Sequence, residues 1–208
     1  MNDEPKKPKP RRLSEIVSSF EGREGFTIGA MVDDFGERAF GALMFIFAIP
    51  NVIPAPPGTS AILGLPLVIL TFQLMLGRQA LWLPDRIRRR PVNSDMVNSF
   101  VRKAVPILKR FETILRPRLS LLVMSNAAER LIGVVTLLLA VVLFLPIPLV
   151  NILPAAAIAC LALALAERDG LFAIIGYLLA ASTVFILFYV STALFAAAKA
   201  FVGTLFGQ

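Results

Sequence analysis

The chain has 208 residues, of which 57% are hydrophobic and 17% are charged. Soluble globular domains carry roughly 45–50% apolar and about 25% charged residues, so this composition predicts an integral membrane protein. The sequence contains no histidine and one cysteine, Cys160. A histidine-assisted nucleophile, a histidine metal site and a disulfide framework are therefore excluded.

Lysine and arginine number 21 against 14 aspartate and glutamate, a formal net charge of +7. Most of the basic residues lie in the first two thirds of the chain, with clusters at residues 6–12 and 86–118. Basic segments that flank apolar runs mark the cytoplasmic side of a membrane and attract anionic lipid headgroups. We therefore expect membrane lipids, including anionic headgroups, as partners, and no nucleic acid. Residues 1–12 have no apolar core, so they predict a basic, disordered cytoplasmic tail and not a cleaved signal peptide.

Residues 13–78 predict a first repeat unit, which is an amphipathic helix followed by a helical hairpin. The amphipathic helix has apolar residues at helical spacing, namely Leu13, Ile16, Val17 and Phe20. Two almost uncharged runs follow at residues 39–54 and 60–76, and the sequence Pro54-Ala55-Pro56-Pro57-Gly58, which cannot be helical, separates them. Helices of this length are slightly short for a hydrocarbon layer of about 30 Å.

Residues 79–103 predict a basic cytoplasmic connector and the start of a second amphipathic helix. Trp82 in this connector is typical of an anchor at the membrane interface. The helix has a basic face made of Arg102, Lys103, Lys109 and Arg110. A basic amphipathic helix lies in the headgroup plane or packs on the protein's own core, and the sequence leaves both alternatives open.

Residues 104–170 predict a second repeat unit, and residues 171–208 predict a C-terminal membrane segment. The second hairpin consists of the apolar runs 131–150 and 153–167, and Pro146-Ile147-Pro148 interrupts it. The C-terminal segment is too long for one ordinary crossing, so it is either two helices or one tilted helix. The predicted fold is therefore an all-α integral membrane protein. It has two repeated, proline-broken helical hairpins, amphipathic interfacial helices and a C-terminal apolar helix or helix pair.

The evidence for a repeat is that similar residues occur in the same order in residues 13–78 and 104–168. The matches are Ile16, Phe20 and Glu21 with Ile107, Phe111 and Glu112; Glu37, Arg38 and Gly41 with Glu129, Arg130 and Gly133; Pro54 and Pro56 with Pro146 and Pro148; and Leu65 and Pro66 with Leu153 and Pro154. Short, proline-interrupted apolar segments in two halves are typical of discontinuous helices around a central transport site. Such tips are either re-entrant, with their backbone satisfied inside the protein, or ordinary turns between two spanning helices.

Two sets of residues are candidates for function or for shaping the hairpins. The binding or transport candidates are Glu37, Arg38, Thr59, Ser60, Gln73, Arg78, Glu129 and Arg130. The two Glu-Arg pairs are either interface residues or ion pairs that gate a cytoplasmic entrance. Thr59 and Ser60 can cap a helix or help it bind an anion, and Gln73 can join two helices or face a cavity. The structural positions are Pro54, Pro56, Pro57, Gly58, Gly64, Pro66, Gly77, Pro146, Pro148 and Pro154.

The run from Asn51 to Leu67, followed by Gln73, Gly77-Arg78 and Trp82-Leu83-Pro84, resembles the signature of the ExoD family of bacterial exopolysaccharide-synthesis membrane proteins. The resemblance covers most of the chain, from about residue 13 to the last apolar block. It implies a place in the bacterial inner membrane and a link to exopolysaccharide production. The family label names a pathway and no reaction.

The sequence has no acidic metal motif, P-loop or glycine-rich dinucleotide loop, so we expect neither an enzyme nor a cofactor or metal. The leading hypothesis is an inner-membrane protein, with a cytoplasmic N-terminus, that assists exopolysaccharide synthesis or export through a small transport or lipid-handling core. The alternatives are a non-transporting structural partner of a polysaccharide synthase and an ion-handling membrane protein that affects the envelope indirectly. A homodimer is expected, because one short chain buries few irregular tips by itself.

Overall fold

The computed structural model describes residues 12–23, 25–52, 59–78, 80–114, 123, 125–144 and 151–206. These residues are helical almost throughout, and the only bridge among them is an isolated antiparallel pair, Thr27 with Pro91. The predicted all-α class is confirmed. The proline tips with Pro54, Pro56, Pro57, Gly58, Pro146 and Pro148, and all but the last residue of the predicted tail, lie outside the described residues.

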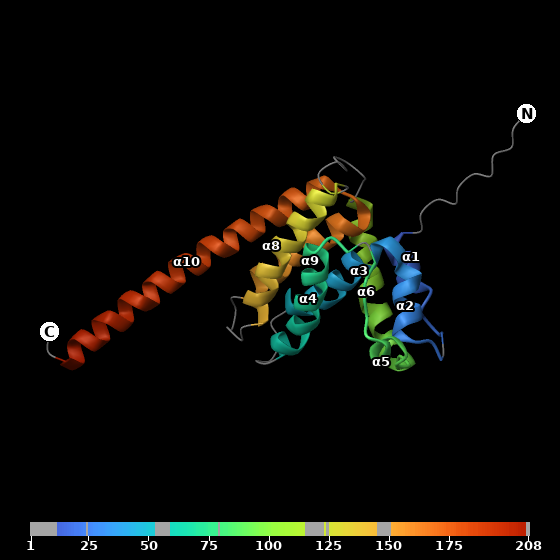
Figure 1. Cartoon of the computed structure of the whole chain (residues 1–208), viewed down its shortest axis with the longest axis horizontal. Coiled ribbons are helices and arrows are strands. Elements are labelled where there is room, and N and C mark those ends of the chain that lie inside the picture. The colour runs from blue at the N-terminus through green and yellow to red at the C-terminus, as the bar shows by residue number, and fades with distance from the viewer. Residues whose placement is uncertain are drawn as a thin grey trace, which may run out of the picture.

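Four apolar helices form the central bundle: α3 (Ala39–Val52), α4 (Thr59–Met75), α8 (Asn126–Phe144) and α9 (Ile152–Glu167). The first helix of each hairpin packs mainly on the second helix of the other hairpin, α3 on α9 and α8 on α4 (Figure 1). Contacts within each hairpin, α3 with α4 and α8 with α9, complete the bundle. The two hairpins are therefore interlocked and do not stand side by side as separate units.

Glycines set how closely these helices approach. Gly41 of α3 lies against the backbone of Ala162 and Ala166 in α9, and Gly133 of α8 lies against Leu74 and Met75 in α4. Small residues at crossing points allow backbones to pack closely where apolar surroundings provide little drive for association. Both contacts pair the start of one helix with the end of the other, so the paired helices are antiparallel. The starts of α3 and α8 and the ends of α4 and α9 thus meet at one end of the bundle, here called the polar end.

Two buried threonines in the interior of the bundle satisfy their hydroxyl groups locally. The buried hydroxyls of Thr71 and Thr136 donate to the carbonyl oxygens of Leu67 and Ile132, one turn earlier in their own helices, at 2.8 and 2.6 Å. Pro154 lies in the first turn of α9, where a missing backbone N–H costs nothing, whereas Pro66 lies inside α4. α9 is rich in alanine, a strong helix former, and most of its residues are buried.

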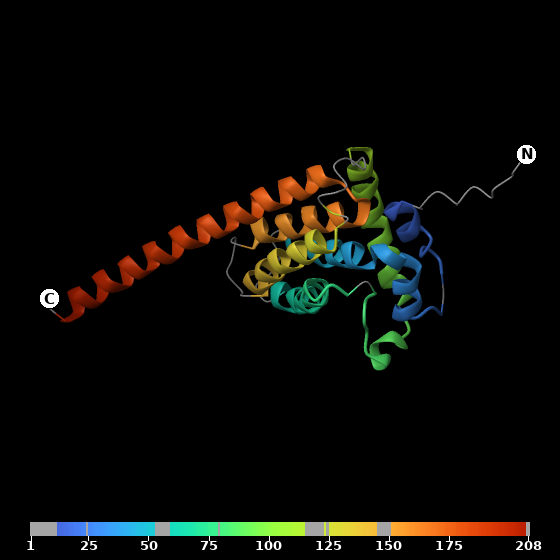
Figure 2. The same cartoon turned by 45° about the horizontal axis from the view of Figure 1, so that its top comes forward.

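The C-terminal segment is one continuous helix, α10 (Gly170–Phe206), and not a helix pair. Asp169 begins it: its buried carboxylate accepts from the Leu171 backbone N–H at 2.9 Å. Gly176 of α10 packs on Leu161 of α9, and α10 then extends past the other helices in both views (Figures 1 and 2). Figure 2 shows α10 on one side of the bundle and α4 on the opposite side.

Within the described ranges, two helices are long and apolar enough to cross a membrane, Asn126–Phe144 and Gly170–Ala193. A third candidate is the pair of α2 (Ile28–Phe35) and α3, which the short 3-10 helix η1 (Gly36–Arg38) joins at a bend of 116°. Two shorter apolar helices, Leu63–Met75 and Ile152–Glu167, complete the set. Length and composition thus give two or three candidate spans.

A layer of four further helices, α1 (Leu13–Ser18), α2, α5 (Asp85–Arg88) and α6 (Ser94–Ile114), covers the polar end. α1 packs on α6, and the buried hydrophobic residues described in the two helices are Leu13, Ile16, Val17, Val97, Val101, Ala104 and Leu108. The apolar face of α6 is therefore used inside the protein, while its basic residues Arg102, Lys103, Lys109 and Arg110 stay exposed. The sequence left two alternatives for this helix, a position in the headgroup plane or packing on the protein's own core. In the structure it packs on the core.

Two helices in this layer were not expected from the sequence. α2 is capped by the Thr27 hydroxyl, which accepts from the Ala30 backbone N–H at 3.3 Å, and α5 (Asp85–Arg88) packs beside it. Phe20 stacks on Phe26 with 5.7 Å between ring centroids and meets Phe35 edge-on. The threonine cap followed by apolar residues at helical spacing was the available signal for α2.

Candidate functional site

A partly buried ion pair at the polar end joins distant segments of the chain. Arg38 Nη1 lies 3.2 Å from Glu167 Oε1, and the two side chains are 20% and 15% exposed. The Leu13 backbone N–H donates to the same Glu167 oxygen at 3.4 Å. Glu167 therefore ties together the start of α3, the end of α9 and the start of α1. From the sequence, the partner expected for Arg38 was its neighbour Glu37. The side chain of Glu37 lies outside the described part.

Arg130 occupies a comparable place in the other half of the bundle. It lies in the first turns of α8, and its guanidinium group packs against Gly77 just after the end of α4, where a side chain would collide with it. Gly77 also has a φ of +72°, which favours glycine. The carbonyl groups at a helix C-terminus attract a cation, so the charge of Arg130 is favourably placed near the end of α4. Glu129 lies beside it in the first turn of α8.

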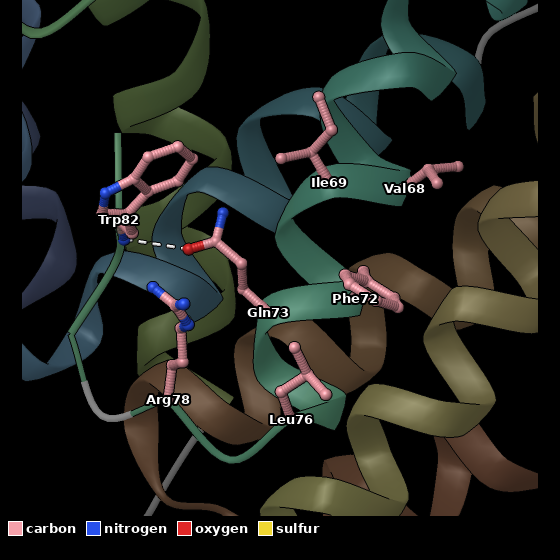
Figure 3. Close-up of a pocket in the computed structure, with 7 residues that line it drawn as sticks. All are labelled: Val68, Ile69, Phe72, Gln73, Leu76, Arg78 and Trp82. Carbon is pink, nitrogen blue, oxygen red and sulfur yellow. Dashed lines mark hydrogen bonds between the residues drawn. The ribbon is translucent and has the colours of Figure 1, made fainter. Parts of the chain in front are cut away.

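Gln73 fixes the chain that leaves α4. Its side chain is buried, and its Oε1 accepts from the backbone N–H of Trp82 at 2.9 Å (Figure 3). The bond runs to the connector after α4 and not to a neighbouring helix, so Gln73 sets the position of Trp82. α4 begins at Thr59, while the side chains of Thr59 and Ser60 lie outside the described part.

A groove of about 310 Å³ opens beside this hydrogen bond, on the outer face of α4. Its lining residues are Val68, Ile69, Phe72, Gln73, Leu76, Arg78 and Trp82 (Figure 3). We call this the α4 groove. Its apolar walls are unusually open for large side chains, with Ile69 at 51%, Phe72 at 48% and Leu76 at 53% exposure. The structure thus brings together two of the predicted site residues, Gln73 and Arg78, and adds Trp82, which the sequence indicated only as an interface anchor.

Arg78 provides the charge of the α4 groove. It is exposed, its guanidinium group points toward Gln73 in the close-up, and it has no ion-pair partner among the residues that the structure describes. The lining set contains no carboxylate, thiol or hydroxyl group. The arrangement therefore suits binding of a molecule that has a hydrocarbon part and an anionic group, and it offers little for acid–base chemistry.

Two buried asparagines lie at the opposite end of the bundle, next to the proline tips. Asn51 Nδ2 donates to the Phe47 carbonyl oxygen at 2.8 Å, and Asn151 Nδ2 donates to the Leu143 carbonyl oxygen at 3.4 Å. Each side chain thus bonds to a carbonyl oxygen near the end of a helix, α3 for Asn51 and α8 for Asn151. Neither asparagine was predicted as a site residue from the sequence. An asparagine within a few residues of a proline-rich break in an apolar run was the signal.

Comparison with known proteins gives consistent matches. The family described as "Exopolysaccharide synthesis, ExoD" matches residues 10–189. The Protein ExoD of Rhizobium meliloti (strain 1021) is 31% identical over 178 residues, which cover 83% of this chain and 73% of that protein. The uncharacterized protein slr1875 of Synechocystis sp. is 35% identical over 136 residues, which cover 65% of this chain.

The match with the Synechocystis protein spans 64% of that relative's length, less than two thirds of it. No solved structure matches the chain. The family match covers all the helices of the central bundle and the α4 groove, so the resemblance in the sequence around the first proline tip is confirmed. The chain belongs to the ExoD family, whose description is exopolysaccharide synthesis.

Proposed function

We propose that this protein is a non-enzymatic component of the inner membrane that assists exopolysaccharide synthesis or export by handling a lipid. The observation that carries the proposal is the α4 groove, in which apolar walls end at Arg78, an arginine without an ion-pair partner among the described residues. Lipids combine a hydrocarbon chain with a polar head in this way. Lipid-linked intermediates are a natural substrate class for a protein that serves polysaccharide assembly.

Placement in the membrane is supported by the apolar surface. The large hydrophobic side chains exposed on α4, α8 and α10 include Leu65, Leu138, Leu178, Phe185 and Phe188. Contiguous apolar surface of this kind is typical of protein that faces lipid. The exposed basic residues of α5 and α6 lie in the layer over the polar end, which favours this end as the cytoplasmic one.

We propose that the bundle consists of two equivalent hairpins, as the internal repeat in the sequence predicts. Under the alignment of the two halves, Gly41 corresponds to Gly133, and Leu74 corresponds to Ala162. The close contacts of Gly41 with Ala162 and of Gly133 with Leu74 are then the same contact made twice. Arg38 at the end of α9 and Arg130 at the end of α4 match in the same way. This equivalence supports two repeated hairpins around a shared centre.

The test of function is exopolysaccharide output in a host strain whose own copy of the gene is deleted. Complementation by the intact chain should restore output, and an Arg78→Gln chain should restore less of it at equal protein level in the membrane fraction. Purified protein in proteoliposomes should then change the distribution of a fluorescent phospholipid between leaflets. Full output with Arg78→Gln, or capture of a synthase without any lipid effect, would favour a structural partner instead.

A further inference from the structure

We infer that the α4 groove is a binding site for one lipid with an anionic phosphate headgroup, with the phosphate at Arg78 and the hydrocarbon chain along Ile69, Phe72 and Leu76. The inference rests on the proposed placement of α4 in the membrane and names the class of lipid that this site selects. The guanidinium group supplies a rigid set of N–H donors that matches a phosphate.

The matching helix α9 shows why the outer face of α4 suits a lipid better than it suits a further helix. Under the alignment of the two halves, Gln73 corresponds to Leu161, which is fully buried because Gly176 of α10 packs on it. The outer face of α9 is therefore apolar and covered by a helix. α10 lies on the far side of the bundle from α4, so the matching face of α4 stays open (Figure 2).

The open face also differs in chemistry from its covered counterpart. It has an amide at position 73, where α9 has Leu161, and a charged residue at position 78, just after the end of α4. A helix laid over α4 would bury the unpaired Arg78 charge, which costs free energy unless the helix supplies a carboxylate. A lipid phosphate neutralises the same charge and leaves the headgroup at the polar surface.

The arrangement of residues along the α4 groove determines where the lipid's headgroup and hydrocarbon chain would lie. Leu76, Phe72 and Ile69 follow one another at helical spacing away from Arg78, so they form one continuous apolar strip. Trp82, 58% exposed, stands beside Arg78, and Gln73 Oε1 holds its backbone in place. Tryptophan is favoured at the depth where headgroups meet hydrocarbon, which is the depth the phosphate would have.

Trp82 is the only tryptophan of the chain, so the α4 groove has a built-in probe. The full-length protein is placed in phosphatidylcholine nanodiscs that contain a small fraction of phosphatidic acid brominated on its acyl chains. A bromine on a lipid in the α4 groove quenches Trp82 emission. Brominated phosphatidic acid should quench more strongly than brominated phosphatidylcholine at equal mole fraction, with roughly a tenfold preference for the charged lipid.

Three variants decide whether Arg78 is responsible. Arg78→Gln should remove the preference, Arg78→Lys should keep most of it, and Arg86→Gln, a matched loss of an exposed arginine on α5, should keep it within about twofold, because single surface charges act weakly on a neighbour. Equal quenching by both lipids in the intact protein, or the same loss in Arg78→Gln and Arg86→Gln, would overturn the site. Full reversal by millimolar inorganic phosphate would show a free-phosphate site and overturn it as well.

Exopolysaccharide output separates this inference from the proposed function. Loss of lipid preference in Arg78→Gln with normal output would leave the lipid site standing and remove its role in the pathway. Reduced output with unchanged quenching would keep the role in the pathway and overturn the lipid site. Loss of both supports the two together.

Discussion

Gly41 and Ala162 are in contact through their backbones: a methyl group placed on Gly41 would lie 2.6 Å from the Ala162 carbonyl oxygen. That distance is well inside the contact distance of carbon and oxygen, and the neighbouring atom belongs to a helix backbone and not to a flexible side chain. The close approach of α3 and α9 therefore requires glycine, which has no side chain, at position 41.

Substitution of Gly41 by leucine should separate α3 from α9 and lower the free energy of unfolding by about 1–3 kcal/mol or prevent folding, because overpacking forces backbone shifts. Gly133→Leu should act in the same way on α8 and α4. Val134→Leu, at an exposed position of the same helix, is the matched control and should have little effect. Thermal unfolding in mild detergent, followed by circular dichroism, measures the difference. Equal melting temperatures for Gly133→Leu and Val134→Leu would contradict the packing described.

The ion pair of Arg38 and Glu167 should contribute measurably to stability because both side chains are mostly buried. A double-mutant cycle with Arg38→Gln and Glu167→Gln should give a coupling free energy of about 1 kcal/mol. The pair of Arg102 and Glu21, with 3.5 Å between Nε and Oε1 and both side chains well exposed, is the control and should show coupling near zero. The opposite order of the two couplings would rule out a special role for the pair at the polar end.

Gln73 should act as an acceptor and not as a packing residue. Gln73→Leu leaves the Trp82 N–H without its bond, so the amide should exchange with solvent faster, at a cost of about 0.5–1.5 kcal/mol. Gln73→Glu keeps an acceptor oxygen and should restore slow exchange. Hydrogen exchange with mass spectrometry of a peptide containing Trp82 follows both variants. Unchanged protection in Gln73→Leu would mean that the connector is held by other contacts.

The proposed orientation can be read with a single engineered cysteine. In a Cys160→Ala background, an Arg89→Cys variant, at an exposed position, should resist an impermeant maleimide in intact cells and react once the cells are opened, if the basic layer has the proposed cytoplasmic orientation. A cysteine fused to a known periplasmic protein provides the positive control. Rapid labelling at position 89 in intact cells would reverse the topology.

The boundaries of the apolar helices follow from the sequence because they depend on local features. Runs of apolar residues and proline-rich breaks placed α3, α4 and α9 within two residues, whereas α8 begins at Asn126, five residues before the predicted run. The C-terminal segment was ambiguous, since a length of 37 residues allows either two helices or one, and only the packing of Gly176 on Leu161 shows how its first part lies.

The candidate site was predictable in its parts and not in its assembly. Arg38 and Glu167 are separated by 129 residues, and one sequence without relatives carries no signal that joins them. From the sequence, Gln73 and Arg78 could be placed at the same helix end. The hydrogen bond between Trp82 and Gln73 depends on the path of the connector, which the sequence does not determine. α2 was missed because its short apolar pattern, between Gly25 and Gly36, is weak beside the long runs around it.

The interlocked pairing of the hairpins has a consequence for the order of synthesis. α3 and α4 leave the ribosome early, but the surfaces that cover Gly41 and Leu74 belong to α9 and α8, which are made in the second half of the chain. Contacts of such long range form late, and a waiting helix exposes its packing surface in the meantime. The first hairpin therefore has to wait as an unfinished half until α8 and α9 are made, and a chain that stops after α4 has no partner with which to complete its fold.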